Sequence, residues 1–440
     1  MLTAIARLSV RLAGRARLLV LVAVVAAVLL VIGAGSYGLT VALSAGGTRL
    51  AGGGSRPEWR LVGDVVSDRW QVSAVLSADK LPDLDCPTTT ACYFVAYGPG
   101  LASGEPPGGL EVTHDGGRTW RQSPVPDVAF LAGIGCAGAD DCMTASSWPS
   151  SNVRFFATSD GGRSWPATRS PHVPADVQVG ALSCPAAGHC IAVGERDGVI
   201  SSVVPPAPGQ STSYAMVTTD DGQTWKVTRL PRGFGPQSLD CPGVDNCVAG
   251  GDTQLLTPSG GGEVSYSSDG GVSWALARLP AGPRSGAYGS FTSISCADVA
   301  DCVTTGSGGR ASAGQVLVSS DGGATWSESA ASGLPRQFAA RQISCPSSTD
   351  CWVAGATPTA NLPGVKNDTG QQRGVLAMTA DGGQAFRVSQ LPPGTEYYSV
   401  TAVSCPAVAV CYAAALKDTN PQVKGSQPQT PFVLLSYSAP

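Results

Sequence analysis

The amino-acid sequence predicts an all-β fold, a seven-bladed β-propeller, and three observations lead to this prediction. An octapeptide with the pattern of residues 319–326 occurs six times, and all fourteen cysteines fall into pairs with one spacing. The two motifs alternate strictly, with a period of about 48 to 60 residues, which is typical of propeller blades. Each period has room for four short strands, the number found in such a blade.

The octapeptide has the residue types of a turn between two strands. Its clearest copy is Ser-Ser-Asp-Gly-Gly-Ala-Thr-Trp at residues 319–326. The aspartate accepts hydrogen bonds from its own turn, glycine adopts positive φ, and Thr-Trp opens the next strand. The aspartates of the six copies are Asp115, Asp160, Asp220, Asp269, Asp321 and Asp381. In the last copy Ala385 and Phe386 replace the hydroxyl residue and the tryptophan.

This octapeptide resembles the Asp-box, or BNR repeat, of the sialidase-like β-propeller superfamily. There the box is a hairpin staple on the rim, so the resemblance implies a structural role for these aspartates and not a catalytic one. Over residues 69 to 437 the chain is most similar in type to the non-catalytic propellers of the photosystem II assembly and stability factors. This resemblance implies a binding platform used in assembling membrane complexes; the cysteine pairs depart from that family.

The cysteine spacing predicts one disulfide within each blade. The pairs are Cys86/Cys92, Cys136/Cys142, Cys184/Cys190, Cys241/Cys247, Cys296/Cys302, Cys345/Cys351 and Cys405/Cys411. Strand-like segments flank each pair, so the two cysteines face each other across a hairpin at a distance that a disulfide can bridge. Five intervening residues do not suit a zinc site, and no metal or other cofactor is expected. The bridges indicate an oxidising compartment.

The last cysteine unit ends near residue 437 without a fourth strand. Residues 69–75 copy the fourth-strand pattern just before the first unit. We therefore expect this N-terminal strand to complete the last blade, which closes the ring and removes free sheet edges.

The N-terminal region predicts a membrane anchor. Residues 1–17 are basic, with four arginines, and residues 18–40 are apolar over a length that spans a bilayer. Residues 41–58 are a Gly-rich linker, and residues 59–440 form the propeller. The expected location is the cell membrane, single-pass, with the propeller on the extracytoplasmic side. The alternative is a secreted protein, released by signal cleavage near Ala45.

The charge pattern bears on the partner. Charged residues make up 14% of the chain, the net charge is −4, and no basic stripe is present, which argues against nucleic-acid binding. Connections between the second and third strands vary most in length, and such variation on one face typically marks the binding side. The expected partner is a protein or a glycan.

Aromatic and basic residues recur where the chain leads into the inner strands. They form the predicted binding ring: Phe130, Phe234, Tyr288, Phe338, Tyr397, Tyr398, Arg232, Arg284 and Arg336. Such a ring can stack on sugars or grip a peptide. The alternative is that the aromatic rings pack between blades.

The alternative function is glycoside hydrolysis of the sialidase type. The superfamily's Phe/Tyr-Arg-Ile-Pro motif is missing, and Arg154-Phe155-Phe156 has the wrong order. Glu396 next to Tyr397 does not match the family's nucleophile pair, which comes from separate strands. Hydrolysis needs two convergent carboxylates, and the pairs Glu195 with Asp197 and Asp368 with Asp418 are only loop candidates. No catalytic residue is therefore assigned, and we expect a non-catalytic binding or scaffold module.

Overall fold

The computed structural model separates residues 1–54 from a second unit, residues 55–440, which contains every described strand. The structure describes residues 58–64, 83–96, 109–126, 128, 131–146, 152–196, 212–253, 261–282, 288–306, 315–358, 372–393, 397–417 and 432–439. Within these ranges no helix is long and apolar enough to cross a membrane. The predicted anchor, residues 18–40, lies outside them.

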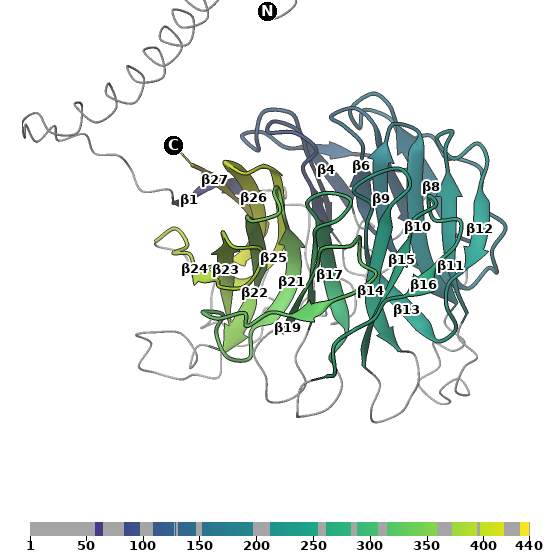
Figure 1. Ribbon diagram of the computed structural model, residues 1–440. Coiled ribbons are helices and arrows are strands. Elements are labelled where there is room, and N and C mark those ends of the chain that lie inside the picture. The colour runs from purple at the N-terminus through teal and green to yellow at the C-terminus, as the bar shows by residue number, and fades with distance from the viewer. Residues whose placement is uncertain are drawn as a thin grey trace, which may run out of the picture. The chain divides into compact units, whose positions relative to one another are not determined.

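The second unit consists of seven antiparallel sheets, and each sheet is a blade (Figure 1). Blade 1 contains β2 (Asp83–Asp85), β3 (Cys92–Ala96), β4 (Gly109–Thr113) and β5 (Arg121–Ser123), and blade 2 contains β6 (Ile134–Cys136), β7 (Cys142–Ser146) and β8 (Arg154–Thr158). Blade 3 contains β9 (Val177–Ala186), β10 (His189–Arg196), β11 (Thr212–Thr218) and β12 (Lys226–Arg229), and blade 4 contains β13 (Phe234–Asp240), β14 (Cys247–Thr253), β15 (Gly262–Ser267) and β16 (Ala275–Leu276).

The remaining three blades follow the same order. Blade 5 contains β17 (Phe291–Cys296), β18 (Cys302–Gly306), β19 (Gln315–Ser319) and β20 (Ser327–Glu328), and blade 6 contains β21 (Ala339–Ser344), β22 (Cys351–Pro358), β23 (Gln372–Thr379) and β24 (Arg387–Val388). Blade 7 contains β25 (Tyr397–Ala407), β26 (Val410–Lys417), β27 (Phe432–Ser438) and β1 (Trp59–Asp64). In blade 2 a single bridge, Phe156 to Ala167, stands in for the fourth strand, next to Pro166, which has no N–H to donate.

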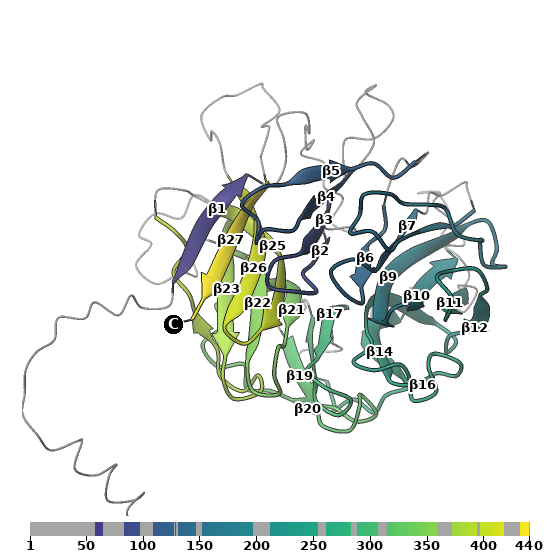
Figure 2. The ribbon, with the colours of Figure 1, turned by 90° about the horizontal axis from the view of Figure 1, so that it is seen from above.

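The first strand of each blade lies at the centre, and these inner strands close a ring (Figure 2). Each of β2, β6, β9, β13, β17 and β21 contacts the inner strand of the following blade, and β25 contacts β2. The seven-bladed propeller that the sequence predicts is thus confirmed.

The hydrophobic core consists of layers between neighbouring blades. Between blades 5 and 6, for example, Val303 and Val316 pack against Phe338, Ile343 and Val353. Because strand side chains alternate between the two faces of a sheet, each blade supplies apolar residues to both neighbouring layers. Each blade is therefore held by its two neighbours.

All seven predicted disulfides are present, each within one blade. Cys296 and Cys302, for example, are directly opposite each other in the pairing of β17 with β18. The turn between each pair of cysteines is thereby closed at its base.

The Asp-box has the hydrogen bonds that its residue types predict. In blade 5, the Ser319 hydroxyl donates to Asp321 Oδ1 over 2.9 Å, and the Thr325 N–H donates to the same atom over 2.8 Å. The Thr325 hydroxyl donates to Asp321 Oδ2 over 2.6 Å. At Asp381 the Ala385 N–H keeps its bond of 2.9 Å, but alanine has no hydroxyl for the last contact.

The strand that completes blade 7 is β1, so the structure corrects the predicted range of residues 69–75, which lies outside the described residues. β1 pairs antiparallel with β27, and Trp59 is opposite Tyr437. Trp59 also packs edge-on against Trp352, with ring centroids 5.0 Å apart. The segment Trp59-Arg60 repeats the Trp-Arg that opens the fourth strand of blade 1, and a second segment of similar pattern, at Trp70, also precedes the first cysteine.

Candidate functional site

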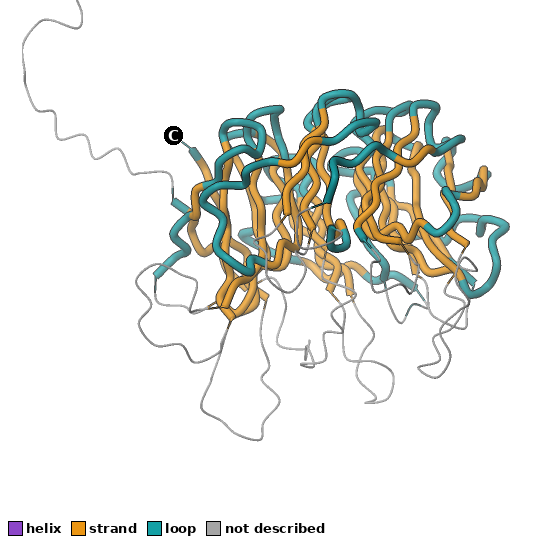
Figure 3. Tube along the Cα trace, turned by 60° about the horizontal axis from the view of Figure 1, so that its bottom comes forward, coloured by secondary structure: helices purple, strands orange, loops and turns teal. Residues whose placement is uncertain are grey.

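The ring has two different faces, between which the strands run (Figure 3). One face carries the disulfide turns together with the Asp-boxes, and we call it the disulfide face. The two motifs are bonded to each other: the N–H of Gly116 donates to Thr90 O, and that of Gly322 donates to Ala300 O, both over 2.9 Å. The second strand of each blade ends, and the third begins, at the opposite face, which we call the variable face.

The connections on the variable face differ widely in length. The shortest is residues 147–153 and the longest is residues 197–211, with long connections also at 359–371 and 418–431. Disulfide turns, in contrast, always have five residues between the cysteines. The predicted candidates Asp197, Asp368, Asp418 and Glu396 lie outside the described residues, and Glu195 lies near the end of β10, opposite Gln178 and Ser213.

The structure places three of the predicted ring aromatics in the core. Phe234, Tyr288 and Phe338 are only 1%, 5% and 2% exposed. Their side chains lie in the hydrophobic layers between blades, and the Tyr288 hydroxyl donates to Ala281 O over 3.4 Å. These three positions therefore correspond to the packing alternative, since a buried ring offers no face for stacking on a sugar.

The other members of the predicted ring are placed differently. Arg232 and Arg336 are exposed, in the short segments that lead into β13 and β21. Tyr397 and Tyr398 begin β25. Phe130 and Arg284 lie outside the described residues.

The inner strands carry a set of inter-blade hydrogen bonds that sequence reasoning missed. The residue before the first cysteine of one blade accepts a hydrogen bond from the N–H of the first cysteine of the next blade. The acceptors are Asp85, Ser183, Asp240, Ser295, Ser344 and Ser404, and the donors are Cys136, Cys241, Cys296, Cys345, Cys405 and Cys86. We call this set the inner ring. A periodic Ser or Asp before the first cysteine is the sequence signal that reveals it.

Blade 2 is the exception in the inner ring because Gly135 occupies the acceptor position. A Cβ at Gly135 would lie 2.5 Å from the Leu182 side chain and 3.2 Å from Leu182 O. The neighbouring β9 therefore comes too close for a serine or an aspartate at this position.

A second layer of bonds runs beside the inner ring. Asp83 Oδ2 accepts a hydrogen bond from the Ile134 N–H over 3.1 Å. Asp83 Oδ1 accepts one over 3.3 Å from the side-chain amide of Gln342, which belongs to blade 6. Gln342 in turn accepts from the Val403 N–H over 3.1 Å. These contacts bring blades 1, 2, 6 and 7 together near the propeller axis.

The carboxyl groups of the inner strands have raised pKa values. Burial raises the pKa of Asp85 to about 7, with a further increase from the nearby Asp83. Burial also raises the pKa of Asp240 to about 6 and raises that of Asp83. Carboxyls with pKa values near neutrality are suited to proton transfer, but structural networks also perturb pKa values. Serines make the same inter-blade bond in four other blades, which favours a structural role for Asp85 and Asp240.

The Asp-box aspartates have the opposite shift. Partial burial raises the pKa of Asp115, but hydrogen bonds from Thr119 and Thr113 outweigh it and lower the value to about 2. These carboxylates stay ionised and bonded within their own turn, as the structural role requires. In the described ranges no group of three His, Cys, Asp or Glu side chains is placed to hold a metal ion.

Comparisons with solved structures find matches at low sequence identity, with TM-scores below 0.5. The chain is similar to YCF48 from Cyanidioschyzon merolae, with 13% identity, a TM-score of 0.49, and coverage of 87% of this chain and 98% of that one. It is also similar to a structure of YCF48 bound to D1 peptide, with 15% identity, a TM-score of 0.49, and coverage of 88% of this chain and 98% of that one. For the Hadza microbial sialidase Hz136 the identity is 12% and the TM-score 0.45, with coverage of 74% of this chain and 73% of that one. No protein-family model and no curated protein matches the sequence.

Proposed function

We propose that this chain is a membrane-tethered, extracytoplasmic propeller that binds a protein partner through its variable face, as a non-catalytic scaffold. The observation that carries the proposal is the contrast between the two faces. On the disulfide face, the turns closed by the seven disulfides all have the same length, and the six Asp-boxes share one pattern. On the variable face, the connections differ in length, from the shortest at residues 147–153 to the longest at residues 197–211. A rigid array with length variation on one side is typical of a binding platform.

The cellular location belongs to the same proposal. Residues 18–40 anchor the chain in the membrane, with residues 1–17 in the cytoplasm. Export explains the seven disulfides, since such bonds persist in oxidising compartments. If the segment is instead cleaved near Ala45, the propeller is released and the binding face is unchanged.

Glycoside hydrolysis is the second candidate function, and the observation that favours it is the pKa of about 7 at Asp85, close to Asp83. A carboxyl of this kind can act as a general acid if a second carboxylate converges on the same substrate. Both side chains, however, already accept backbone hydrogen bonds across a blade junction. Turnover of a sialoside or another glycoside that is abolished by Asp85→Asn would favour this second function.

The proposal is tested by affinity purification of the full chain from its native membranes. In the test variant, residues 197–211 are replaced by the seven-residue connection 147–153, and in the control Val408 on the disulfide face becomes Ser. The expected result is one protein partner captured by the wild type and the control but lost from the connection variant. Equal capture by all three proteins would refute a role for this connection.

A further inference from the structure

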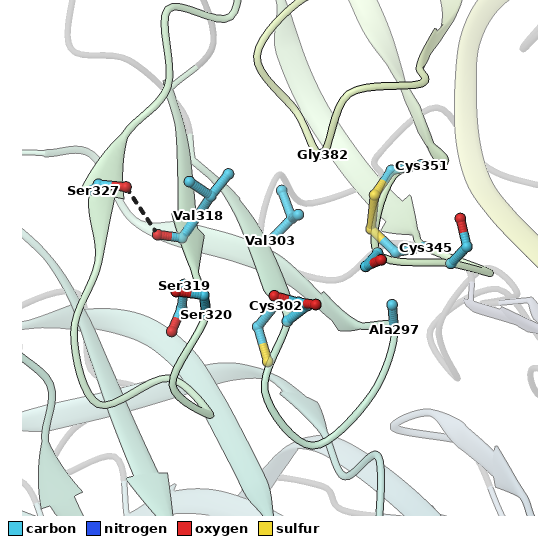
Figure 4. Close-up of a pocket in the computed structure, with 13 residues that line it drawn as sticks. Ala297, Cys302, Val303, Val318, Ser319, Ser320, Ser327, Cys345, Cys351 and Gly382 are labelled. Carbon is cyan, nitrogen blue, oxygen red and sulfur yellow. Dashed lines mark hydrogen bonds between the residues drawn. A yellow bond between two sulfur atoms is a disulfide. The ribbon is translucent and has the colours of Figure 1, made fainter.

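A pocket of about 190 Å³ opens between blades 5 and 6 on the disulfide face (Figure 4). On the side of blade 5 its lining includes Val303, Ser320 and Ser327. On the side of blade 6 it includes Ser348 and Gly382, whose backbone carbonyls matter below. All of them belong to the repeated motifs, so the pocket can be compared position by position with the other blade junctions.

At the junction of blades 1 and 2 the corresponding space is filled by large side chains. Tyr93 donates its hydroxyl to Ala139 O over 2.6 Å. The Nε2 atom of His114 lies 2.9 Å from Gly161 O, and the Arg121 guanidinium donates to Gly161 O and Gly162 O over 3.3 and 3.2 Å. A phenol, an imidazole and a guanidinium thus satisfy the carbonyls of the next blade.

The same three positions in blade 5 carry small side chains. Val303, like Tyr93, follows the second cysteine; Ser320, like His114, precedes the Asp-box aspartate; Ser327, like Arg121, follows the Asp-box tryptophan. Ser348 and Gly382 correspond in turn to Ala139 and Gly161. The pocket is therefore the space that the three large side chains fill in blade 1, with two acceptor carbonyls left at its wall.

Other junctions show why this one is open. Val248 has the same size as Val303, but a Cβ at Gly323 would lie 2.8 Å from Val248, whereas a Cβ at Gly383 would lie 3.7 Å from Val303 and 3.3 Å from its nearest blade 5 neighbour, Val318. The Asp-box of blade 5 thus comes closer to blade 4 than that of blade 6 does to blade 5. Between blades 2 and 3, where Met143 occupies the position, the equivalent space is only about 10 Å³.

The open pocket also carries negative charge. Asp301 lines it, at the position of Ala91 in blade 1, and no Lys, Arg or His is among the lining residues. The carboxylate of Asp301 makes no hydrogen bond to any part of the chain that the structure describes, although its backbone is held by Asp298. Hydroxyls, two carbonyls and a carboxylate together form an acceptor-rich, anionic wall.

We infer that the pocket between blades 5 and 6 binds an arginine side chain of a partner protein. The guanidinium takes the place that Arg121 has in blade 1: it donates to Gly382 O and pairs with the Asp301 carboxylate. A planar cation with several N–H donors matches this wall better than a point charge or an apolar ring. The pocket is on the face opposite the variable connections, so this site is independent of the proposed variable-face partner.

The test is a titration of the full chain in detergent with N-acetyl-L-arginine amide, followed by calorimetry or NMR. The neutral isostere N-acetyl-L-citrulline amide is the matched ligand, and we expect it to bind about tenfold more weakly. Ser327→Arg places the chain's own guanidinium in the pocket and should abolish binding. Asp301→Asn should weaken binding about tenfold, whereas Asp141→Asn, at the equivalent position of blade 2, where the space next to blade 3 is only about 10 Å³, should leave it unchanged.

Three results would each overturn the inference: no binding of the arginine amide to the wild type, equal binding of the citrulline amide, or unaltered binding to Ser327→Arg. A thermal melt shows that each variant is folded. Position 327 is exposed, so the substitution is compatible with the fold. If the inserted arginine makes the contacts of Arg121, the melting temperature of Ser327→Arg should also rise above that of the wild type.

Discussion

Asp85 Oδ2 in blade 1 accepts a hydrogen bond of 2.8 Å from the backbone N–H of Cys136 in blade 2. The bond connects the end of one inner strand to the disulfide turn of the next blade. The same bond recurs at five other junctions among the described residues, so the inner ring links the ends of the inner strands at every junction except the one between blades 2 and 3. Its two aspartates, unlike its serines, make the strength of the inner ring depend on pH.

The first prediction concerns this pH dependence. The pKa of Asp85 is about 7 in the folded chain and about 4 when unfolded, so the folded state binds the proton more tightly. Stability contributed by protonation is thus present below about pH 4 and is lost as the pH rises through 7. Asp85→Asn, which stays neutral and keeps an acceptor, should come close to the wild type at pH 4 and be more stable at pH 8, by on the order of 2–4 kcal/mol.

Denaturant unfolding at the two pH values measures this difference. Ser344→Ala is the control, since it removes an inner-ring acceptor that does not titrate. Its destabilisation should be the same at both pH values. An Asp85→Asn effect that is also independent of pH would show that folding does not raise the pKa of Asp85.

The second prediction concerns the incomplete Asp-box. Ala385 lacks the hydroxyl that donates to the aspartate in the other five copies, as Thr325 does to Asp321 over 2.6 Å. Ala385→Thr should supply it and raise stability by about 0.5 kcal/mol, since the site is exposed. Thr325→Ala should lower stability by a similar amount. The gain should vanish in Asp381→Ala, where the new hydroxyl has no acceptor; a gain that persists there would have another origin.

The third prediction concerns the disulfides. Replacing Cys405 and Cys411 together by Ser should lower the free energy of unfolding by about 2 kcal/mol, because the closed loop is short. Peptide mapping without reduction should give the pair Cys296–Cys302 and its six equivalents. Bridges between different blades would contradict the structure.

The fourth prediction concerns the closing strand. Trp59 packs against Trp352 and Tyr437, so Trp59→Ala should destabilise the propeller by about 3–5 kcal/mol. Deleting residues 59–64 should expose β27, whose residues 432–435 are all apolar, and promote aggregation, as measured by light scattering. Leu61→Ser is the control, because this side chain is 45% exposed. A deletion variant that stays monomeric with unchanged stability would show that β1 is dispensable.

Much of the fold was predictable because each blade repeats its own local chemistry. The Asp-box turn and the cysteine pair depend on residues close together in sequence, and repetition makes each of them visible several times. The closing strand was harder to place: Trp59 and Trp70 both follow the fourth-strand pattern, and only the pairing with β27 distinguishes them. The burial of Phe234 and Phe338 was also open, because an aromatic residue before an inner strand can face the axis or a neighbouring blade.

The pocket between blades 5 and 6 was not predictable from the motifs alone. Its volume depends on three small side chains, of which Val303 is one, and on how closely the next Asp-box approaches. The first factor is visible in an alignment of the repeats, but the second requires coordinates. The inner ring, in contrast, leaves a clear periodic signal, a Ser or Asp before six of the seven first cysteines.

The central claim, that a protein partner binds on the variable face, is tested most directly by photo-crosslinking in cells. In one variant a photoreactive amino acid replaces Thr212, at the start of β11 on the variable face. In the other it replaces Val408, which is 49% exposed on the disulfide face and does not line the pocket between blades 5 and 6. The account predicts a discrete protein adduct from position 212 and none from position 408. An adduct from position 408 alone, or the absence of any adduct together with measurable glycoside turnover, would contradict it.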